Sequence, residues 1–180
     1  MRTKYLTRAS AIAALYVILV VIEIPLGSLA FGPVQIRIAE ALVLLPLVDL
    51  AAIPGVFVGC MLANFILTFF APFGIIDVFG GSLVTLTAAY LTSKTVYITE
   101  YIAKSVPQSI SDKSKKILNI VIGSIPPVVL NALIISIWIS EGMGVPYWFS
   151  VTWVGIGQIA AVGLLGSIVL YAYERIKDKI

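Results

Sequence analysis

Long apolar runs, separated by short stretches rich in Gly, Pro and polar residues, dominate the pattern of the chain. The runs are continuous rather than alternating, which predicts helices rather than strands. Most reach the length of about 20 residues that crosses a bilayer. Within a bilayer every backbone polar group must be paired inside the protein, as a helix does unaided. We predict six spanning helices, at residues 7–24, 36–49, 52–70, 75–93, 117–139 and 147–173.

The second predicted span, 36–49, is short for a membrane crossing. At 1.5 Å per residue it covers about 20 Å, against a hydrocarbon core of about 30 Å. We expect it to be tilted, or its ends to meet polar surface made by other spans or loops. Pro46 and Pro54 flank the turn that follows and would bend or stop helices there.

Composition supports an all-α integral membrane protein with a single six-helix domain over residues 1–180. Hydrophobic residues make up 60% of the chain, charged residues only 12%, and the mean hydropathy is +1.07. The lone Cys60 excludes an internal disulfide, and the absence of histidine excludes His-ligated metal or haem sites. No phosphate-binding Gly-rich loop and no catalytic pair is found. We therefore predict a transport subunit that is not an enzyme, with no cofactor, no metal and no nucleic-acid partner.

Basic residues gather on one predicted side of the membrane. With six spans, both termini, the turn at 49–52 and the connection 94–116 share a side. Lysine and arginine are enriched in cytoplasmic loops, so we predict that both termini are cytoplasmic in the cell membrane. That side holds every basic residue but Arg37: Arg2, Lys4, Arg8, Lys94, Lys104, Lys113, Lys115, Lys116, Arg175, Lys177 and Lys179.

The opposite, outer side holds one basic residue, Arg37, and the acids Glu23, Glu40, Asp77 and Glu141. A net acidic mouth would favour a cationic or amine-bearing ligand. Excluding Lys and Arg from outer loops would also leave acids behind by default. Both explanations remain open at this point.

Three amide side chains, Asn64, Asn131 and Gln158, fall at a similar depth in three different spans. Counted from the predicted outer ends, each is about 10–17 Å deep. Amides offer donors and acceptors, which suits the edge of a heterocycle. Alternatively, they hydrogen-bond between helices as packing contacts.

The charged residues on the predicted outer side can each have either a structural or a ligand-binding role. Arg37 and Glu40 are three residues apart on one helix face, so they either pair with each other or act on a ligand. Asp77 either stabilises the start of the fourth helix or meets a ligand donor. Glu141, in a Gly-rich loop, is either a ligand acceptor or a solvent-facing charge.

Aromatic and small residues complete the candidate surfaces. Trp148 and Trp153 either belong to an interfacial aromatic belt or stack on a planar ligand. Ala9 and Ala13, with Ser10 and Ala14, form a small-residue face at the cytoplasmic end of the first span. Such a face lets another helix approach closely.

Five stretches resemble the QueT family, the substrate-binding S components assigned to queuosine precursors among energy-coupling factor (ECF) transporters. They touch spans two to six in order: QIRIAEALVLLP (35–46), IPGVFVGCMLAN (53–64), DVFGGSLVTLTAA (77–89), PPVVLNALI (126–134) and VGIGQ (154–158). One departure is Gln158, where the family pattern typically has glutamate. A carboxylate matches two adjacent N–H donors of a guanine-like base, whereas an amide offers only one acceptor.

The resemblance implies a six-helix bundle that binds substrate near its outer face, with the loop after the first span as a lid. It implies as partners a transmembrane coupling protein, met by the small-residue face, and two ATPase subunits. The subunit is expected to topple in the bilayer to deliver its ligand. The resemblance gives ligand-binding roles to Arg37, Glu40, Asn64, Asp77 and Asn131.

We therefore predict a subunit that captures a 7-deazaguanine such as 7-aminomethyl-7-deazaguanine. Its base would stack on Trp148 or Trp153, acids among Glu40, Asp77 and Glu141 would accept its N–H groups, and the amides would orient the ring. The alternatives are an S component for another vitamin or heterocycle, and a non-transport membrane scaffold.

Overall fold

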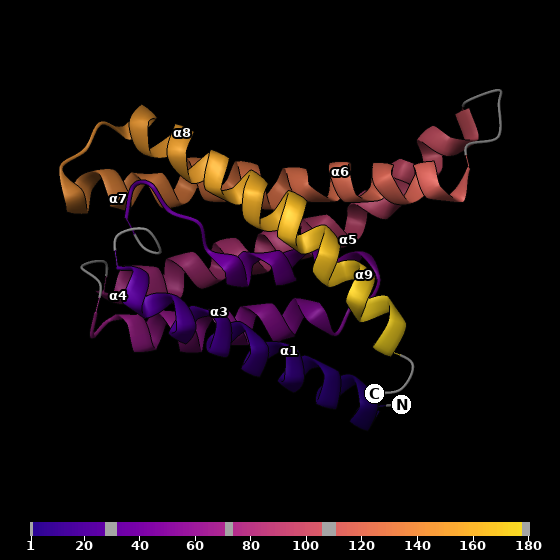
Figure 1. Cartoon of the computed structure of the whole chain (residues 1–180), viewed down its shortest axis with the longest axis horizontal. Coiled ribbons are helices and arrows are strands. Elements are labelled where there is room, and N and C mark those ends of the chain that lie inside the picture. Colours follow the sequence, from indigo (N-terminus) through magenta and orange to yellow (C-terminus); the bar gives the residue numbers. More distant parts are fainter. Residues whose placement is uncertain (1, 28–31, 71–73, 106–110, 178–180) are drawn as a thin grey trace.

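The structure is a computed structural model and describes residues 2–27, 32–70, 74–105 and 111–177. This part of the chain forms six helical rods, several of which change helix type along their length (Figure 1). The rods are α1 (Arg2–Glu23) with η1 (Ile24–Leu26); η2 (Ile38–Leu47); α3 (Ala52–Leu67); α4 (Gly74–Ile76) with η3 (Asp77–Gly81) and α5 (Ser82–Ser105); α6 (Asp112–Leu130) with η4 (Asn131–Ile135) and α7 (Ser136–Met143); and α8 (Tyr147–Gln158) with η5 (Ile159–Leu165) and α9 (Gly166–Ile176).

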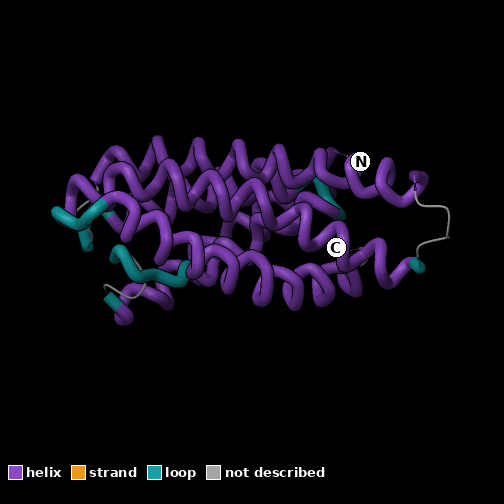
Figure 2. Tube along the Cα trace, turned by 90° about the horizontal axis from the view of Figure 1, so that it is seen from above, coloured by secondary structure: helices purple, strands orange, loops and turns teal. Residues whose placement is uncertain are grey.

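The all-helical prediction and the number of rods are confirmed for the described residues. Three rods are long and apolar enough to cross a membrane: Arg2–Leu26, Asp112–Met143 and Tyr147–Ile176. The helices η2 and α3 are apolar but shorter. Figure 2 shows the rods running along the long axis of the bundle, with the loops at its two ends.

The second rod, η2, is the centre of the core. All its residues from Ala39 to Pro46 are buried, and α1, α3, α5 and α9 pack around it. It is a 3₁₀ helix of 10 residues, which at about 2.0 Å per residue spans only about 20 Å. Polar residues of the same segment flank it, Arg37 before it and Asp49 after it.

Glycines bring α3 against α1. A Cβ on Gly55 would lie 2.9 Å from the Ala9 carbonyl oxygen, and one on Gly59 would lie 2.7 Å from the Cβ of Tyr16. Both distances are too short for a real side chain, so each glycine permits the close approach. The contact sets the position of Tyr16, which is fully buried.

A proline in α6 creates an acceptor that α5 uses. Pro127 has no N–H, so it cannot donate to the carbonyl of Gly123, four residues earlier. The Thr92 hydroxyl on α5 donates to this carbonyl at 2.9 Å. The pair therefore joins two rods by satisfying a group that the proline leaves free.

The predicted end of the fourth span at residue 93 is wrong. Helix α5 continues to Ser105. It therefore includes the first part of the segment 94–116, which was predicted to be a polar connection because of its charges. The charges do not break the helix, because Thr95 and Thr99 are buried while Lys94 lies outward, over the rings of Tyr90 and Tyr97.

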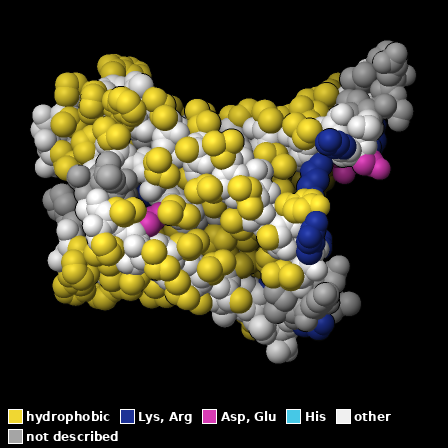
Figure 3. Space-filling model, viewed as in Figure 1, with side chains coloured by type: hydrophobic (Ala, Val, Ile, Leu, Met, Phe, Trp, Pro, Cys, Tyr) yellow, Lys and Arg dark blue, Asp and Glu magenta, His cyan; other side chains and the backbone are white. Residues whose placement is uncertain are grey.

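The start of α1 and the end of α9 lie at the same end of the bundle, near the end of α5 and the start of α6 (Figure 1). The visible Lys and Arg side chains gather at this end in Figure 3, and the middle of the surface is covered by hydrophobic side chains. The arrangement agrees with an even number of crossings. That this end of the bundle faces the cytoplasm remains a prediction.

Candidate functional site

Polar residues from five rods meet in what we call the polar layer. Its members are the buried residues Tyr16, Arg37, Glu40, Asn64 and Asn131 and the half-buried Asp77. Glu40, only 1% exposed, lies in the first turn of η2. One of its oxygens accepts a hydrogen bond from the Tyr16 hydroxyl at 2.5 Å, and the other accepts from Asn131 Nδ2 at 3.4 Å. Both carboxylate oxygens are thus occupied by residues of other rods.

Arg37 binds an amide rather than the neighbouring acid. Its Nη2 donates to Asn64 Oδ1 at 2.8 Å, and Asn64 Nδ2 donates in turn to the backbone carbonyl of Asp77 at 2.7 Å. No ion pair joins Arg37 to Glu40 in the described part of the chain. The alternative that these two residues pair with each other is therefore wrong.

Asp77 lies in the first turn of its rod but does not cap it. The rod begins at Gly74, and Asp77 opens the π-helical stretch η3, where an acid is favoured by the helix dipole, so the structural and the ligand-binding interpretations of Asp77 both stand. A Cβ on Gly81 would lie 2.7 Å from Asp77 Oδ1 and 3.0 Å from Asn64 Nδ2. The Asp77 carboxylate and the Asn64 amide therefore both lie against the bare backbone of Gly81, where a larger residue would displace them.

Three π-helical stretches coincide with predicted site residues. One begins at Asp77, one begins at Asn131, and the third begins directly after Gln158. A π turn widens an α-helix locally and redirects side chains, and such turns are frequent at functional sites. The coincidence on three separate rods supports the choice of these residues.

The segment before η2 crosses α8 beside Gln158. A Cβ on Gly157 would lie only 1.8 Å from the backbone oxygen of Gln35, so this contact requires glycine. Gln35 and Gln158 are both buried, at 8% and 4% exposed. The crossing brings the sixth rod to the chain two residues before Arg37.

Two buried residues of α1 join the site: Tyr16, which the sequence did not indicate, and Glu23, which it indicated only as one acid of the outer mouth. Glu23, only 1% exposed, accepts a hydrogen bond through Oε1 from the backbone N–H of Ile38, at the start of η2. Tyr16 and Glu23 are seven residues apart, which places them on one face of α1. Their common position on one face of the first predicted helix is the sequence pattern that could have identified both as site residues.

Four buried polar atoms in this region have no hydrogen-bond partner among the described residues. They are Arg37 Nε, Glu23 Oε2, Asp77 Oδ1 and Gln158 Oε1; the other buried atoms of the described residues without a hydrogen-bond partner belong to Arg8, Asn119, Ser136, Trp138 and Ser150. Buried polar atoms are nearly always paired, so unpaired ones at a site need an explanation. Together the four atoms of this region comprise one donor and three acceptors that are buried without a partner.

The other candidates lie outside the polar layer. Glu141 is exposed, Trp148 is 70% exposed and Trp153 is 39% exposed. Trp148 packs edge-to-face on Tyr147, with ring centroids 5.1 Å apart, and Trp153 packs on Phe149 at 6.3 Å. These contacts fit an aromatic belt at the bundle surface.

The predicted partner face borders α3 and lines one groove. Ala9 and Ala13 face the glycines of α3, and Ala13 is buried there. All four residues line a groove between α1 and α3, in which Ser10 and Ala14 are exposed and Ala9 is half-buried. Ser10 and Ala14 are therefore the residues of the face most accessible to a partner.

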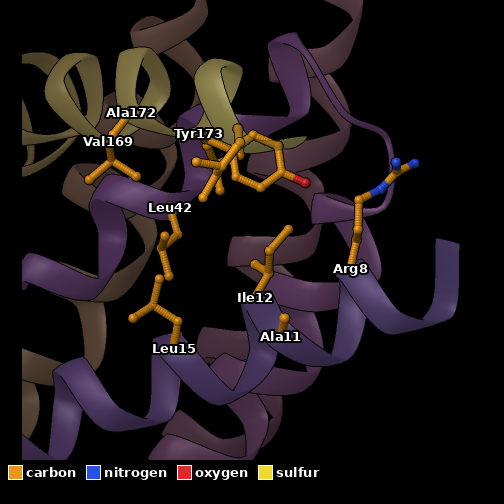
Figure 4. A pocket seen from close by; sticks show the side chains of 10 residues that line it. Arg8, Ala11, Ile12, Leu15, Leu42, Val169, Ala172 and Tyr173 are labelled. Carbon is orange, nitrogen blue, oxygen red and sulfur yellow. The ribbon is translucent and has the colours of Figure 1, made fainter. Parts of the chain in front are cut away.

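A second apolar groove lies at the same end of the bundle, on another side of α1, between α1, η2 and α9 (Figure 4). Figure 4 shows Leu15, Leu42 and Tyr173 along its walls. Beside it, Asp49 accepts a hydrogen bond from the Tyr173 hydroxyl at 2.6 Å and pairs with Arg8 Nε at 2.9 Å. The groove shares no residue with the polar layer.

Comparison with known proteins gives one match. A family model described as QueT transporter matches residues 6–175, nearly the whole chain. Neither the curated proteins nor the solved structures gave a match.

Proposed function

The chain belongs to the QueT transporter family of membrane transport proteins, and from this premise we propose that it is the substrate-binding S component of an ECF-type importer. Its substrate is a queuosine precursor of the 7-deazaguanine class, held in the polar layer. The single observation that carries the proposal is the set of four unpaired, buried polar atoms around this layer.

The chemistry of these atoms supports a guanine-like ligand. Glu23 Oε2, Asp77 Oδ1 and Gln158 Oε1 can only accept hydrogen bonds if the acids are ionised, and Arg37 Nε can only donate. A 7-deazaguanine is rich in N–H donors and has one carbonyl oxygen that would suit the arginine. In a site closed to water, each such bond is stronger than at the surface.

The charges support a ligand that carries an amine. Arg37 is the one cation of this region in the described chain, against the buried or half-buried acids Glu23, Glu40 and Asp77. A buried excess of negative charge is costly unless a cation neutralises it. The protonated aminomethyl group of 7-aminomethyl-7-deazaguanine would do so.

The energy for uptake comes from partners in this proposal. The described chain holds no group of acids and cysteines arranged to bind a metal ion, and its sequence has no phosphate-binding loop. Two ATPase subunits and a transmembrane coupling protein supply ATP hydrolysis and movement. The exposed residues Ser10 and Ala14 are the proposed contact with the coupling protein.

A role as a purely structural scaffold accounts less well for the polar layer. Polar networks that only join helices are normally satisfied within the protein. Here Arg37, Asp77 and Gln158 each retain an unpaired atom.

Calorimetric titration of the purified subunit with 7-deazaguanines tests the proposal. We expect binding of 7-aminomethyl-7-deazaguanine that Asn131→Ala weakens, because this change removes the donor to Glu40. Binding of another vitamin, with no binding of any deazaguanine, would overturn the ligand class while leaving the transport role. If no small molecule binds and Asn131→Ala lowers only stability, the scaffold explanation holds instead.

A further inference from the structure

Glu23 is a buried carboxylate with one oxygen in use and one free. Its Oε1 accepts from the backbone N–H of Ile38, which lies between Arg37 and Glu40 in the chain. Its Oε2 is buried with no partner among the described residues. No basic side chain is recorded within 4.0 Å of this carboxylate in the part of the chain the structure describes.

We propose that Glu23 is the residue that selects for a cationic substituent on the substrate, with Oε2 accepting a hydrogen bond from the protonated amine. The inference rests on the proposed function and deepens it by assigning the amine to one acid. The base edge of the ligand is then left to Asp77 and Gln158.

The distribution of partners favours Glu23 for this role over the other two acids. Both oxygens of Glu40 already accept hydrogen bonds, from Tyr16 and Asn131. Asp77 is only half-buried, so its charge is less costly to leave without a cation than that of the fully buried Glu23. Glu23 has only a neutral backbone N–H as its partner.

A purely structural role for Glu23 makes a different prediction. The carboxylate could simply cap the start of η2, where backbone N–H groups lack helical partners. That role needs one acceptor oxygen and no second one. Glutamine keeps an acceptor for the Ile38 N–H and removes the negative charge, so Glu23→Gln separates the cap from the selection of the amine.

The experiment compares two ligands that differ in charge at one position, 7-aminomethyl-7-deazaguanine and the neutral 7-cyano-7-deazaguanine. For the wild type and Glu23→Gln, calorimetry in detergent gives Kd for both. We expect Glu23→Gln to weaken binding of the amine about tenfold or more, as for loss of a charge-assisted hydrogen bond, and to change the Kd of the cyano compound less than about threefold. Glu100→Gln, the same change at an exposed glutamate of α5, is the matched control and should alter neither.

Each other outcome counts against the inference. Equal loss for both ligands would show that Glu23 only maintains the fold, and unchanged Kd for both would show that it does not touch the amine. If the wild type binds the cyano compound as tightly as the amine, there is no charge selection to assign, although the proposed function stands. If it binds neither, the proposed ligand class fails and the assignment of Glu23 fails with it.

Discussion

At the scale of single residues, Glu40 shows how the polar layer is built. A carboxylate buried to 1% exposure is tolerated when both of its oxygens are hydrogen-bonded. Its donors come from α1 and from the start of η4, so one side chain joins three rods. Removing either donor leaves an unpaired oxygen in the protein interior, which is the costly arrangement.

Tyr16→Phe tests this dependence. The change removes only the hydroxyl that donates to Glu40 at 2.5 Å. We expect a loss of about 1–2 kcal/mol in the free energy of unfolding, because a buried carboxylate oxygen loses its partner. Thermal unfolding in detergent measures it. Tyr97→Phe, at a tyrosine that is 67% exposed, is the control, and equal effects of the two changes would contradict the role given to Tyr16.

The polar residues of the site were predictable one by one, but most of their contacts were not. Arg37, Glu40, Asn64, Asp77 and Asn131 stand out because polar groups are costly in apolar spans. Which of them pair depends on the packing of separate rods, which no local pattern encodes. The pairing of Arg37 with Glu40, one of the two alternatives considered, is wrong for this reason: spacing along the chain made them neighbours, but Asn64, 27 residues away, binds the arginine.

At the scale of elements, close backbone contacts determine where the rods meet. The contact of Gly157 with the Gln35 carbonyl attaches the segment before η2 to α8. In the sequence, Gly157 is one of several glycines in its span. Its role depends on a segment more than a hundred residues earlier in the chain, so it could not be predicted from local sequence.

Gly157→Ala should displace that segment. The added Cβ would lie 1.8 Å from a backbone oxygen, and no rotamer change can relieve a clash with backbone. We expect destabilisation of about 1–3 kcal/mol, as for overpacking, together with weaker ligand binding. Gly163→Ala, in the same rod with open space around it, should be neutral or slightly stabilising in thermal unfolding. Equal stability of the two variants would show that the 35–36 segment is free to move away.

At the scale of the whole molecule, basic side chains are distributed unevenly along the bundle axis. The basic residues gather at the end where α1 begins and α9 ends (Figure 3). Length and hydropathy were enough to predict six rods. They could not predict the extension of α5 to Ser105, because charge along a helix was taken for the end of a span.

Thiol labelling in cells tests the predicted orientation. Native Cys60 is fully buried, so it should give little background with a membrane-impermeant maleimide. We expect Glu141→Cys, in the last turns of α7, to react in intact cells, and Glu100→Cys on α5 to react only after the membrane is permeabilised. Labelling in the reverse order would place both termini outside.

The three π-helical stretches also have a consequence for comparing related sequences. Each π turn holds one residue more than the α turn it replaces. A relative with the same fold but a regular helix at that level would lack one residue in mid-span. Correct alignment would then require a one-residue gap within an apolar segment, where alignments ordinarily forbid gaps. Without that gap, residues after Asp77, Asn131 or Gln158 would be matched to positions about 100° away around the helix.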